Sequence, residues 1–351
     1  CKKALVVSDK FLTENGVVEK VTKVLDQVGI EHTLYNDVKQ NPSVANVEGG
    51  LEVLKKENCD FIVSIGGGSP QDCGKAISVL ATNGGKITDY EGVNKSQKKC
   101  LPIVAIATTA GTSAEVTINY VITDEETHIK MIMVDRNTLA SITVNDPELM
   151  LSKPAGLTAA TGMDALTHAI EGYTTKAAWE MTDMFHIKAI ELISDSLRGA
   201  VENTPEGREG MAMGQYIAGM GFSDVGLGIV HSMAHALGAV YDTPHGVANA
   251  ILLPTVMEYN ADATGDKYKY IAKAMGVEGV EDMTQEEYRK AAVDAVKKLS
   301  ADVGIPADLK EIVKEEDIQF LAESAYADAC APGNPKDASV EDIIGLYKSL
   351  L

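Results

Sequence analysis

The first part of the chain alternates short apolar runs with amphipathic segments. Apolar runs of four to eight residues are typical of strands buried in a parallel sheet, where both faces are covered. Four such runs are expected as strands: Ala4–Ser8, His32–Tyr35, Phe61–Ile65 and Ile103–Ala107. Helical spacing is expected over Val17–Val28, and Ser43 is placed to cap a helix that ends at Asn58. The pattern predicts an open α/β sheet with helical crossovers.

After Ala107 the expected strands alternate apolar and polar residues, and from Pro154 onward no further strands are expected. Tyr120–Thr123 and Met131–Val134 alternate apolar and polar residues around an acidic turn, which favours an antiparallel pair. A last short strand is expected over Ser141–Val144, and helical periodicity dominates from Pro154 onward. Five of the helices expected there are Leu157–Thr174, Trp179–Glu202, Gly210–Gly221, Gly228–Tyr241 and Val247–Asn260. We place a domain boundary near residues 146–156 and predict an α/β domain over 1–150 and an all-helical domain over 151–351.

A glycine-rich turn follows the third expected strand. Gly66, Gly67 and Gly68 let the backbone come close to a ligand, and Ser69 is expected to cap the next helix, with Asp72 completing a capping box. Glycines that open a helix provide a phosphate site. Neither the GxGxxG nor the Walker pattern matches, and an ordinary turn without a ligand is the alternative. The hydroxyl-rich run at 108–115, after the fourth strand, leaves the same two interpretations open.

Charge and cysteine content narrow the function classes. The net charge of −20 opposes binding to a nucleic acid, since phosphates would be repelled. Five cysteines without a CxxC pair favour a reducing compartment, and the composition suits a cytoplasmic enzyme. No apolar run is long enough to span a membrane, and no leader is recognisable. We expect the natural N-terminus to lie upstream of Cys1, which is not preceded by Met.

Candidate metal ligands cluster in the helical half. Asp164 and His168 are four residues apart, as are His231 and His235, and His245 follows in an expected loop after a proline. A spacing of four places both side chains of a pair on one face of a helix. A carboxylate and several imidazoles can hold Fe²⁺, Mn²⁺ or Zn²⁺, while a polar hydrogen-bond network is the alternative. Spacing does not decide between His231 and His235 as a ligand. No role is assigned to the isolated histidines His32, His128 and His186.

Four long motifs carry a family resemblance. In chain order they are GGGSPQD, TTAGTSAEVTINYVITDEE, ATGMDALTHAIEGY and GFSDVGLGIVHSMAHALGAVYDTPHGVANAILLP. With their order and separations, they resemble the iron-activated alcohol dehydrogenases from Lys3 to the C-terminus. The resemblance implies a fold like that of dehydroquinate synthase, with an α/β dinucleotide-binding domain followed by an all-α metal-binding domain. It also implies a homodimer, although relatives usually begin some residues earlier, with a strand that helps to form the dimer.

The resemblance also implies roles for individual residues. It implies Fe²⁺ ligands at Asp164, His168, His231 and His245, with Zn²⁺ as a possible substitute, and His235 as a proton relay near the substrate. The residues implied to contact NAD(H) are Asp9, Asn41, Gly67, Gly68, Ser69, Thr108, Thr109, Thr112 and Lys130. In the members that interconvert lactaldehyde and 1,2-propanediol, to which the resemblance is greatest, the substrate pocket is lined at Asn119, Phe222 and Cys330.

The reaction implied is hydride transfer between a nicotinamide and a small aldehyde or alcohol, assisted by a Lewis-acidic metal. Two alternatives are considered. A synthase or lyase of the dehydroquinate synthase type would need a basic pocket for substrate phosphate, and no cluster of Lys or Arg lies near the metal motifs. A non-catalytic metal-binding or self-assembling protein would not need both a cofactor set and a metal set.

Overall fold

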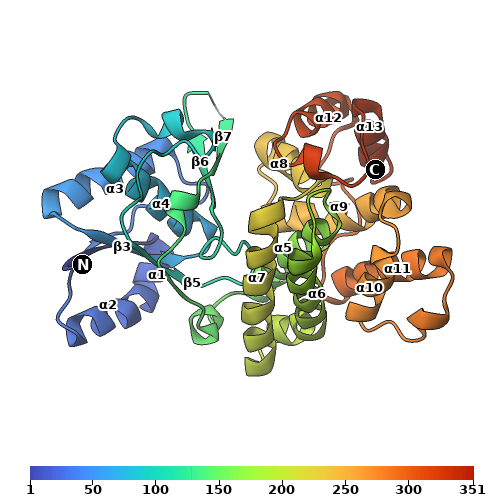
Figure 1. Cartoon of the computed structure of the whole chain (residues 1–351), viewed down its shortest axis with the longest axis horizontal. Helices are drawn as coiled ribbons and strands as arrows, with labels where there is room; N and C mark the ends of the chain where they lie inside the picture. The colour runs from blue at the N-terminus through green and yellow to red at the C-terminus, as the bar shows by residue number, and fades with distance from the viewer. Residues whose placement is uncertain (128) are drawn as a thin grey trace. The chain divides into compact units, whose positions relative to one another are not determined.

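The computed structural model of the chain describes residues 1–127 and 129–351, so His128 lies outside the described residues (Figure 1). The chain forms two compact units. The first comprises Cys1–Thr109 and Ser113–Met150, and the second comprises Ala110–Thr112 and Leu151–Leu351. Each unit is described by itself.

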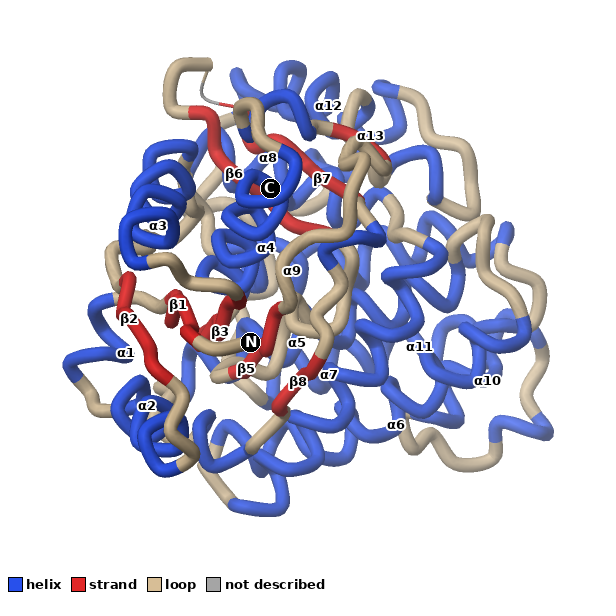
Figure 2. The backbone as a smooth tube through the Cα atoms, turned by 60° about the vertical axis from the view of Figure 1, so that its left-hand side comes forward, coloured by secondary structure: helices blue, strands red, loops and turns tan. Residues whose placement is uncertain are grey.

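A parallel sheet of five strands forms the centre of the first unit (Figure 2). The strands are β1 (Lys3–Val7), β2 (Glu31–Tyr35), β3 (Phe61–Gly66), β5 (Ile103–Ala107) and β8 (Ile142–Val144). Their order is β2-β1-β3-β5-β8, and every pairing is parallel. The four strands expected from apolar runs are confirmed within a residue or two at each end. Most residues of β1, β3 and β5 are buried, as is typical of strands in the middle of a parallel sheet, while the edge strands β2 and β8 are more exposed.

A smaller sheet and four helices complete this unit. The sheet has the order β4-β7-β6, and β6 and β7 are antiparallel, as the alternating pattern predicts. The remaining elements are β4 (Gly92–Val93), β6 (Asn119–Asp124), β7 (Ile129–Val134), α1 (Lys10–Glu14), α2 (Val17–Gln27), α3 (Val44–Glu57), α4 (Gly68–Asn83) and the 3₁₀ turns η1 (Ile87–Tyr90), η2 (Arg136–Thr138) and η3 (Pro147–Met150). Ser43 caps α3 and forms a capping box with Asn46.

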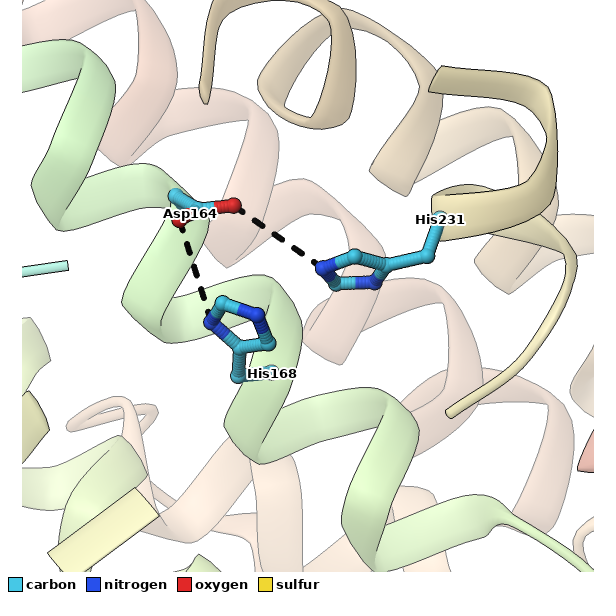
Figure 3. A group of neighbouring side chains, drawn as sticks. All are labelled: Asp164, His168 and His231. Atoms are coloured by element: carbon cyan, nitrogen blue, oxygen red, sulfur yellow. Dashed lines mark ion pairs between the residues drawn. The ribbon is translucent and has the colours of Figure 1, made fainter. Parts of the chain in front are cut away.

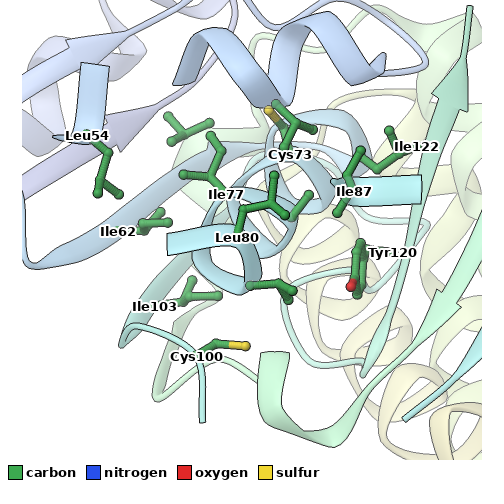
Figure 4. Packing of buried hydrophobic residues seen from close by; sticks show 14 of the residues in the cluster. Leu54, Ile62, Cys73, Ile77, Leu80, Ile87, Cys100, Ile103, Tyr120 and Ile122 are labelled. Carbon is green, nitrogen blue, oxygen red and sulfur yellow. The ribbon is translucent and has the colours of Figure 1, made fainter. Parts of the chain in front are cut away.

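The main hydrophobic core of the first unit lies around α4. Ile77 and Leu80 of this helix contribute to one cluster with Ile62 of β3, Ile103 of β5 and Ile122 of β6 (Figure 4). Burial of such side chains is worth about 1.5–3 kcal/mol each, so this cluster anchors α4 firmly to the strands. The start of α4 is therefore held in place directly after β3.

The start of α4 differs from the expectation. The helix begins at Gly68, its N-cap is Gly67, and no side chain caps it. The expected N-cap at Ser69 is therefore wrong, since Ser69 lies inside the first turn. The carboxylate of Asp72 does not form a capping box either, because it accepts a hydrogen bond from the backbone N–H of Val121 on β6. With Ser69 as the N-cap, the helix would begin at Pro70. It begins two residues earlier, at Gly68.

The second unit is helical. In the described part of the chain, no strand follows Pro154, as the periodicity predicts. Its helices are α5 (Ala155–Thr174), α6 (Glu180–Val201), α7 (Pro205–Val225), α8 (Ile229–Tyr241), α9 (His245–Asn260), α10 (Lys267–Ala274), α11 (Gln285–Asp302), α12 (Ile318–Tyr326) and α13 (Val340–Lys348), with 3₁₀ turns η4 (Ala261–Ala263), η5 (Val280–Asp282), η6 (Glu315–Asp317) and η7 (Ala331–Gly333). None of the helices in the described residues is both long and apolar enough to cross a membrane.

Three helices of this unit matter most for the site. The helix α5 lies beside α6, α7 and α9, and α8 lies beside α9 (Figure 1). His245 was expected in a loop, but it is the first residue of α9. The preceding Pro244 has φ −56° and ψ 125°, an extended conformation that leads directly into the helix.

Candidate metal centre and nucleotide-binding turn

Three buried polar side chains converge inside the helical unit. Asp164 and His168 lie one turn apart on α5, and His231 faces them from α8 (Figure 3). Asp164 Oδ2 is 3.9 Å from His168 Nδ1, and Asp164 Oδ1 is 3.9 Å from His231 Nε2. All three residues are at least 95% buried. A carboxylate and two imidazoles in this arrangement can hold a metal ion.

His245 approaches the same carboxylate from a third helix. Its Nε2 lies 3.5 Å from Asp164 Oδ1, and its ring is 5.3 Å from the ring of His231. The side chain of His245 is 38% exposed, so this side of the cluster is open to solvent within the helical unit. The residues that the sequence placed in two distant patches therefore meet around Asp164.

The chemistry of these side chains fits a divalent cation. Burial lowers the pKa of His168, and burial lowers the pKa of His231 well below its usual value. Both imidazoles are therefore neutral near pH 7, which is the form that binds metals. His168 Nδ1 is buried and has no hydrogen-bond partner among the described residues, although a buried nitrogen normally has one. Three imidazoles and a carboxylate form a set that suits Fe²⁺ or Zn²⁺.

Glu171, which the sequence analysis did not single out, supports His231. Its Oε2 lies 2.5 Å from His231 Nδ1, and its Oε1 accepts a hydrogen bond from the backbone N–H of Val230. Burial raises the pKa of Glu171 to about 8, partly offset by backbone N–H groups. The short contact itself requires a proton between Glu171 Oε2 and His231 Nδ1. A proton held at Nδ1 leaves Nε2 of His231 bare toward Asp164. The only signal in the sequence is the spacing of seven from Asp164, which places Glu171 on the same face of α5.

His235 lies at the edge of the cluster and has its own carboxylate partner. Its ring stacks on that of His245, with centroids 5.3 Å apart. Its Nδ1 lies 2.9 Å from Asp328 Oδ2, and Asp328 also accepts a hydrogen bond from the backbone N–H of Cys330. Burial opposes ionisation of Asp328, but His235 and Cys330 together hold its pKa below the usual value. Asp328 lies 93 residues from His235, so spacing could not reveal it.

The expected pocket residues fall in different places. Phe222 on α7 is buried and stacks on His168 with ring centroids 4.3 Å apart. Burial raises the pKa of the Cys330 thiol well above its usual value, so this residue is a neutral thiol beside Asp328. Asn119 belongs to the first unit, where its backbone oxygen accepts a hydrogen bond from Lys75. The structure thus brings Phe222 and Cys330 to the histidine cluster and leaves Asn119 on β6.

The glycine turn at the end of β3 makes a tight contact with the next loop. A Cβ atom at Gly67 would lie 2.9 Å from Thr109 Cγ2, so only glycine fits there without a shift. The backbone N–H of Thr108 donates to the carbonyl of Gly66. The uncapped start of α4, with Gly68 and Ser69 in its first turn, faces no capping side chain. These features fit a diphosphate, which binds to backbone N–H groups at a helix start.

Other expected cofactor residues lie near this sheet edge or pair with each other. Asp9 follows β1 and caps α1 by accepting a hydrogen bond from the backbone N–H of Leu12. Lys130 Nζ donates to Asn41 Oδ1 over 3.1 Å, and Asn41 has a positive φ of 54°. Thr112 is the one expected cofactor residue that belongs to the second unit.

The chain belongs to the iron-containing alcohol dehydrogenase family. The model of the iron-containing alcohol dehydrogenases matches residues 1–147, and the model of the C-terminal part of the same family matches residues 158–351. It is therefore an oxidoreductase of the alcohol dehydrogenase class, and the expected fold class is confirmed. The alternative of a synthase or lyase finds no support.

Several individual proteins are similar to this chain over nearly its full length. Lactaldehyde reductase of Escherichia coli (strain K12) is 53% identical over 349 residues, which cover 99% of this chain and 91% of that protein. The NAD-dependent methanol dehydrogenase of Bacillus methanolicus is 44% identical over 353 residues, which cover 100% of this chain and 92% of that protein. Among solved structures, a 1,3-propanediol oxidoreductase superposes with a TM-score of 0.98 at 45% identity, covering 100% of this chain and 92% of that one.

Proposed function

We propose that this protein transfers hydride between NAD(H) and a small aldehyde or alcohol, with lactaldehyde and 1,2-propanediol as its natural pair. The observation that carries the proposal is the convergence of Asp164, His168, His231 and His245 in a protein of this family. The substrate pair follows from the 53% identity to a lactaldehyde reductase. We also propose that it works as a homodimer in the cytoplasm, where its five free cysteines would stay reduced.

Asp164, His168, His231 and His245 would hold Fe²⁺, with Zn²⁺ as a possible substitute. Bound there, the cation supplies Lewis acidity at a carbonyl or alcohol oxygen, while the nicotinamide supplies the hydride. Glu171 keeps a proton at His231 Nδ1 and thereby directs Nε2 toward the centre. Phe222, stacked on His168, excludes water from the buried side.

The first unit would bind the dinucleotide. Gly67, Gly68 and Ser69 would receive the diphosphate at the start of α4, with Thr108 and Thr109 in the adjacent loop of the same unit. Asp9 would accept hydrogen bonds from the ribose hydroxyls, and Lys130 with Asn41 would contact the nicotinamide half.

His235 is proposed to move the proton that alcohol formation requires. Asp328 occupies its Nδ1, so Nε2 is the nitrogen that can exchange a proton with the substrate oxygen, directly or through a ribose hydroxyl. Replacing His235 with alanine is expected to leave the metal content intact, lower kcat by roughly 10²-fold and alter the dependence of the rate on pH. Metal analysis and rate measurements across pH would check this. The companion variant Asp328→Asn should change the profile in the same direction, and an unchanged profile in His235→Ala would rule out the relay.

Asp9 is expected to set the preference for NADH. A carboxylate that accepts a hydrogen bond from the 2′-hydroxyl also repels a 2′-phosphate. Asp9→Gly should therefore raise the ratio of kcat/KM for NADPH to that for NADH by roughly tenfold or more. Asp9 also caps α1, so Asp9→Ser, which keeps a capping oxygen without the charge, separates the two roles. Both variants should shift the ratio alike, and a ratio unchanged in both would show that Asp9 does not select the cofactor.

A substrate panel tests the proposed reaction. The protein would be mixed with Fe²⁺, NADH and either lactaldehyde, 3-hydroxypropanal or formaldehyde, and the loss of reduced nicotinamide followed. Lactaldehyde is expected to have the highest kcat/KM, by roughly tenfold, since one carbon or hydroxyl changes pocket contacts by about that much. Equal rates for all three would contradict the substrate assignment and leave the reaction class standing. No oxidation of NADH with any aldehyde would contradict the class.

A further inference from the structure

A buried amide stands at the centre of the metal-ligating side chains. Asn249 lies on α9, one turn after His245, and is fully buried. Its Nδ2 is 2.7 Å from Asp164 Oδ1, 3.1 Å from His245 Nε2 and 3.2 Å from His231 Nε2. One nitrogen atom therefore contacts three of the four side chains proposed to hold the cation.

The amide points its nitrogen into the centre because Asp164 Oδ1 is an acceptor, as is His231 Nε2 when Nδ1 carries the proton facing Glu171. These two atoms require N–H groups opposite them, so the carbonyl oxygen of Asn249 faces away. That oxygen is buried and accepts no hydrogen bond among the described residues. The amide has two N–H bonds for three contacts, so one contact has no hydrogen. The arrangement is therefore only partly satisfied.

A cation would need the same space. The distances of 3.5 and 3.9 Å from Asp164 Oδ1 to His245 Nε2 and His231 Nε2 are short enough for all three atoms to reach one ion, since two atoms bound at about 2.0–2.2 Å are at most about 4.4 Å apart. An N–H group within hydrogen-bond distance of all three atoms cannot stay there, because its hydrogens would point at a positive charge. The amide and the cation thus exclude each other in this orientation.

We propose that Asn249 closes the metal-free centre: its amide nitrogen takes the place of the cation and must turn away before the cation is bound. This inference rests on the proposed metal site and extends it to the metal-free state. In that state the amide compensates the buried carboxylate of Asp164 and keeps His231 and His245 from collapsing or rotating. The same contacts oppose metal uptake, because they are lost when the cation binds.

The test is the Zn²⁺ affinity and thermal stability of Asn249→Ala, with Zn²⁺ chosen because it does not oxidise. Removal of the amide should lower the Tm of the metal-free protein, while Zn²⁺ should bind roughly tenfold more tightly in competition with a chelator, since the lost hydrogen bond involves a charged group. The milder Asn249→Ser, which can still donate to one acceptor, should lie between the wild type and the alanine variant.

The matched control is Asn260→Ala on the same helix. Asn260 is also a buried asparagine, but its amide pairs with Asn334 and not with the histidine cluster. This control should lower the Tm and leave Zn²⁺ affinity unchanged. Equal or weaker Zn²⁺ binding by Asn249→Ala would overturn the inference, weaker binding in particular meaning that the amide assists the bound cation. A wild-type protein that binds no cation would overturn the proposed metal site as well.

Discussion

Replacing His245 with alanine is expected to abolish both metal retention and turnover while the fold survives. His245 Nε2 lies 3.5 Å from Asp164 Oδ1, and its side chain is partly exposed, so its removal leaves no large cavity. If His245 is one of the four proposed ligands, its loss weakens binding of the cation and removes several kcal/mol of transition-state stabilisation. The rate should fall roughly a thousandfold or more. Metal analysis after dialysis and kcat/KM with NADH would be measured side by side.

The control for this variant is His32→Ala in the first unit. His32 Nδ1 lies 3.6 Å from Asp26 Oδ1, and His32 belongs to a different unit from the four proposed ligands. The His32→Ala variant should therefore keep the metal content and rate of the wild type. Unchanged iron content and rate in His245→Ala would remove His245 from the ligand set and leave Asp164, His168 and His231 as the candidates.

Gly246→Ala is expected to damage the same centre without touching any ligand. A Cβ atom at Gly246 would lie 2.3 Å from the carbonyl oxygen and 2.7 Å from the carbonyl carbon of Ala160 on α5. Both atoms belong to the backbone and cannot rotate away, so α9 must move from α5. Overpacking of this kind costs about 3 kcal/mol, and displaced ligands weaken metal binding roughly tenfold or more. A lower Tm together with weaker Zn²⁺ binding is the expected result.

Gly156→Ala provides the comparison on α5. A Cβ there would meet nothing within 4 Å, so the change should leave Tm unchanged or raise it slightly. If Gly246→Ala retained wild-type stability and affinity, the close approach of α5 and α9 would not control the spacing of His245 from Asp164.

The sequence predicts a helix or strand best where a single local pattern determines which of the two forms. The runs at 61–65 and 103–107 are buried strands because no other element suits so short an apolar run. The N-cap expected at Ser69 was wrong because α4 starts at Gly68, directly after Gly66, which has a positive φ of 156°. The run of three glycines does not indicate at which of them the helix begins. His245 was expected in a loop because the proline before it indicates a turn, yet proline also precedes helices readily.

The site is predictable only as far as its residues repeat at helical spacing. Asp164 with His168 follows this rule, while the carboxylate partner of His235 and the amide of Asn249 become recognisable only when distant helices meet. Asn249 is four residues after His245, but an asparagine in an apolar helix gives no indication of the three polar side chains around it. Long-range packing, which no local pattern encodes, brings these groups together.

Isotope transfer tests most directly whether the protein transfers hydride from NADH to the substrate and whether this transfer depends on the bound cation. The metal-stripped protein and the same protein reloaded with Fe²⁺ would be incubated with lactaldehyde and NADH carrying deuterium at the transferable position. We expect deuterium at the carbinol carbon of the product only in the reloaded sample, with the His245→Ala variant inactive in both. Equal deuterium transfer with and without the cation would contradict the account, as would a product alcohol without the label.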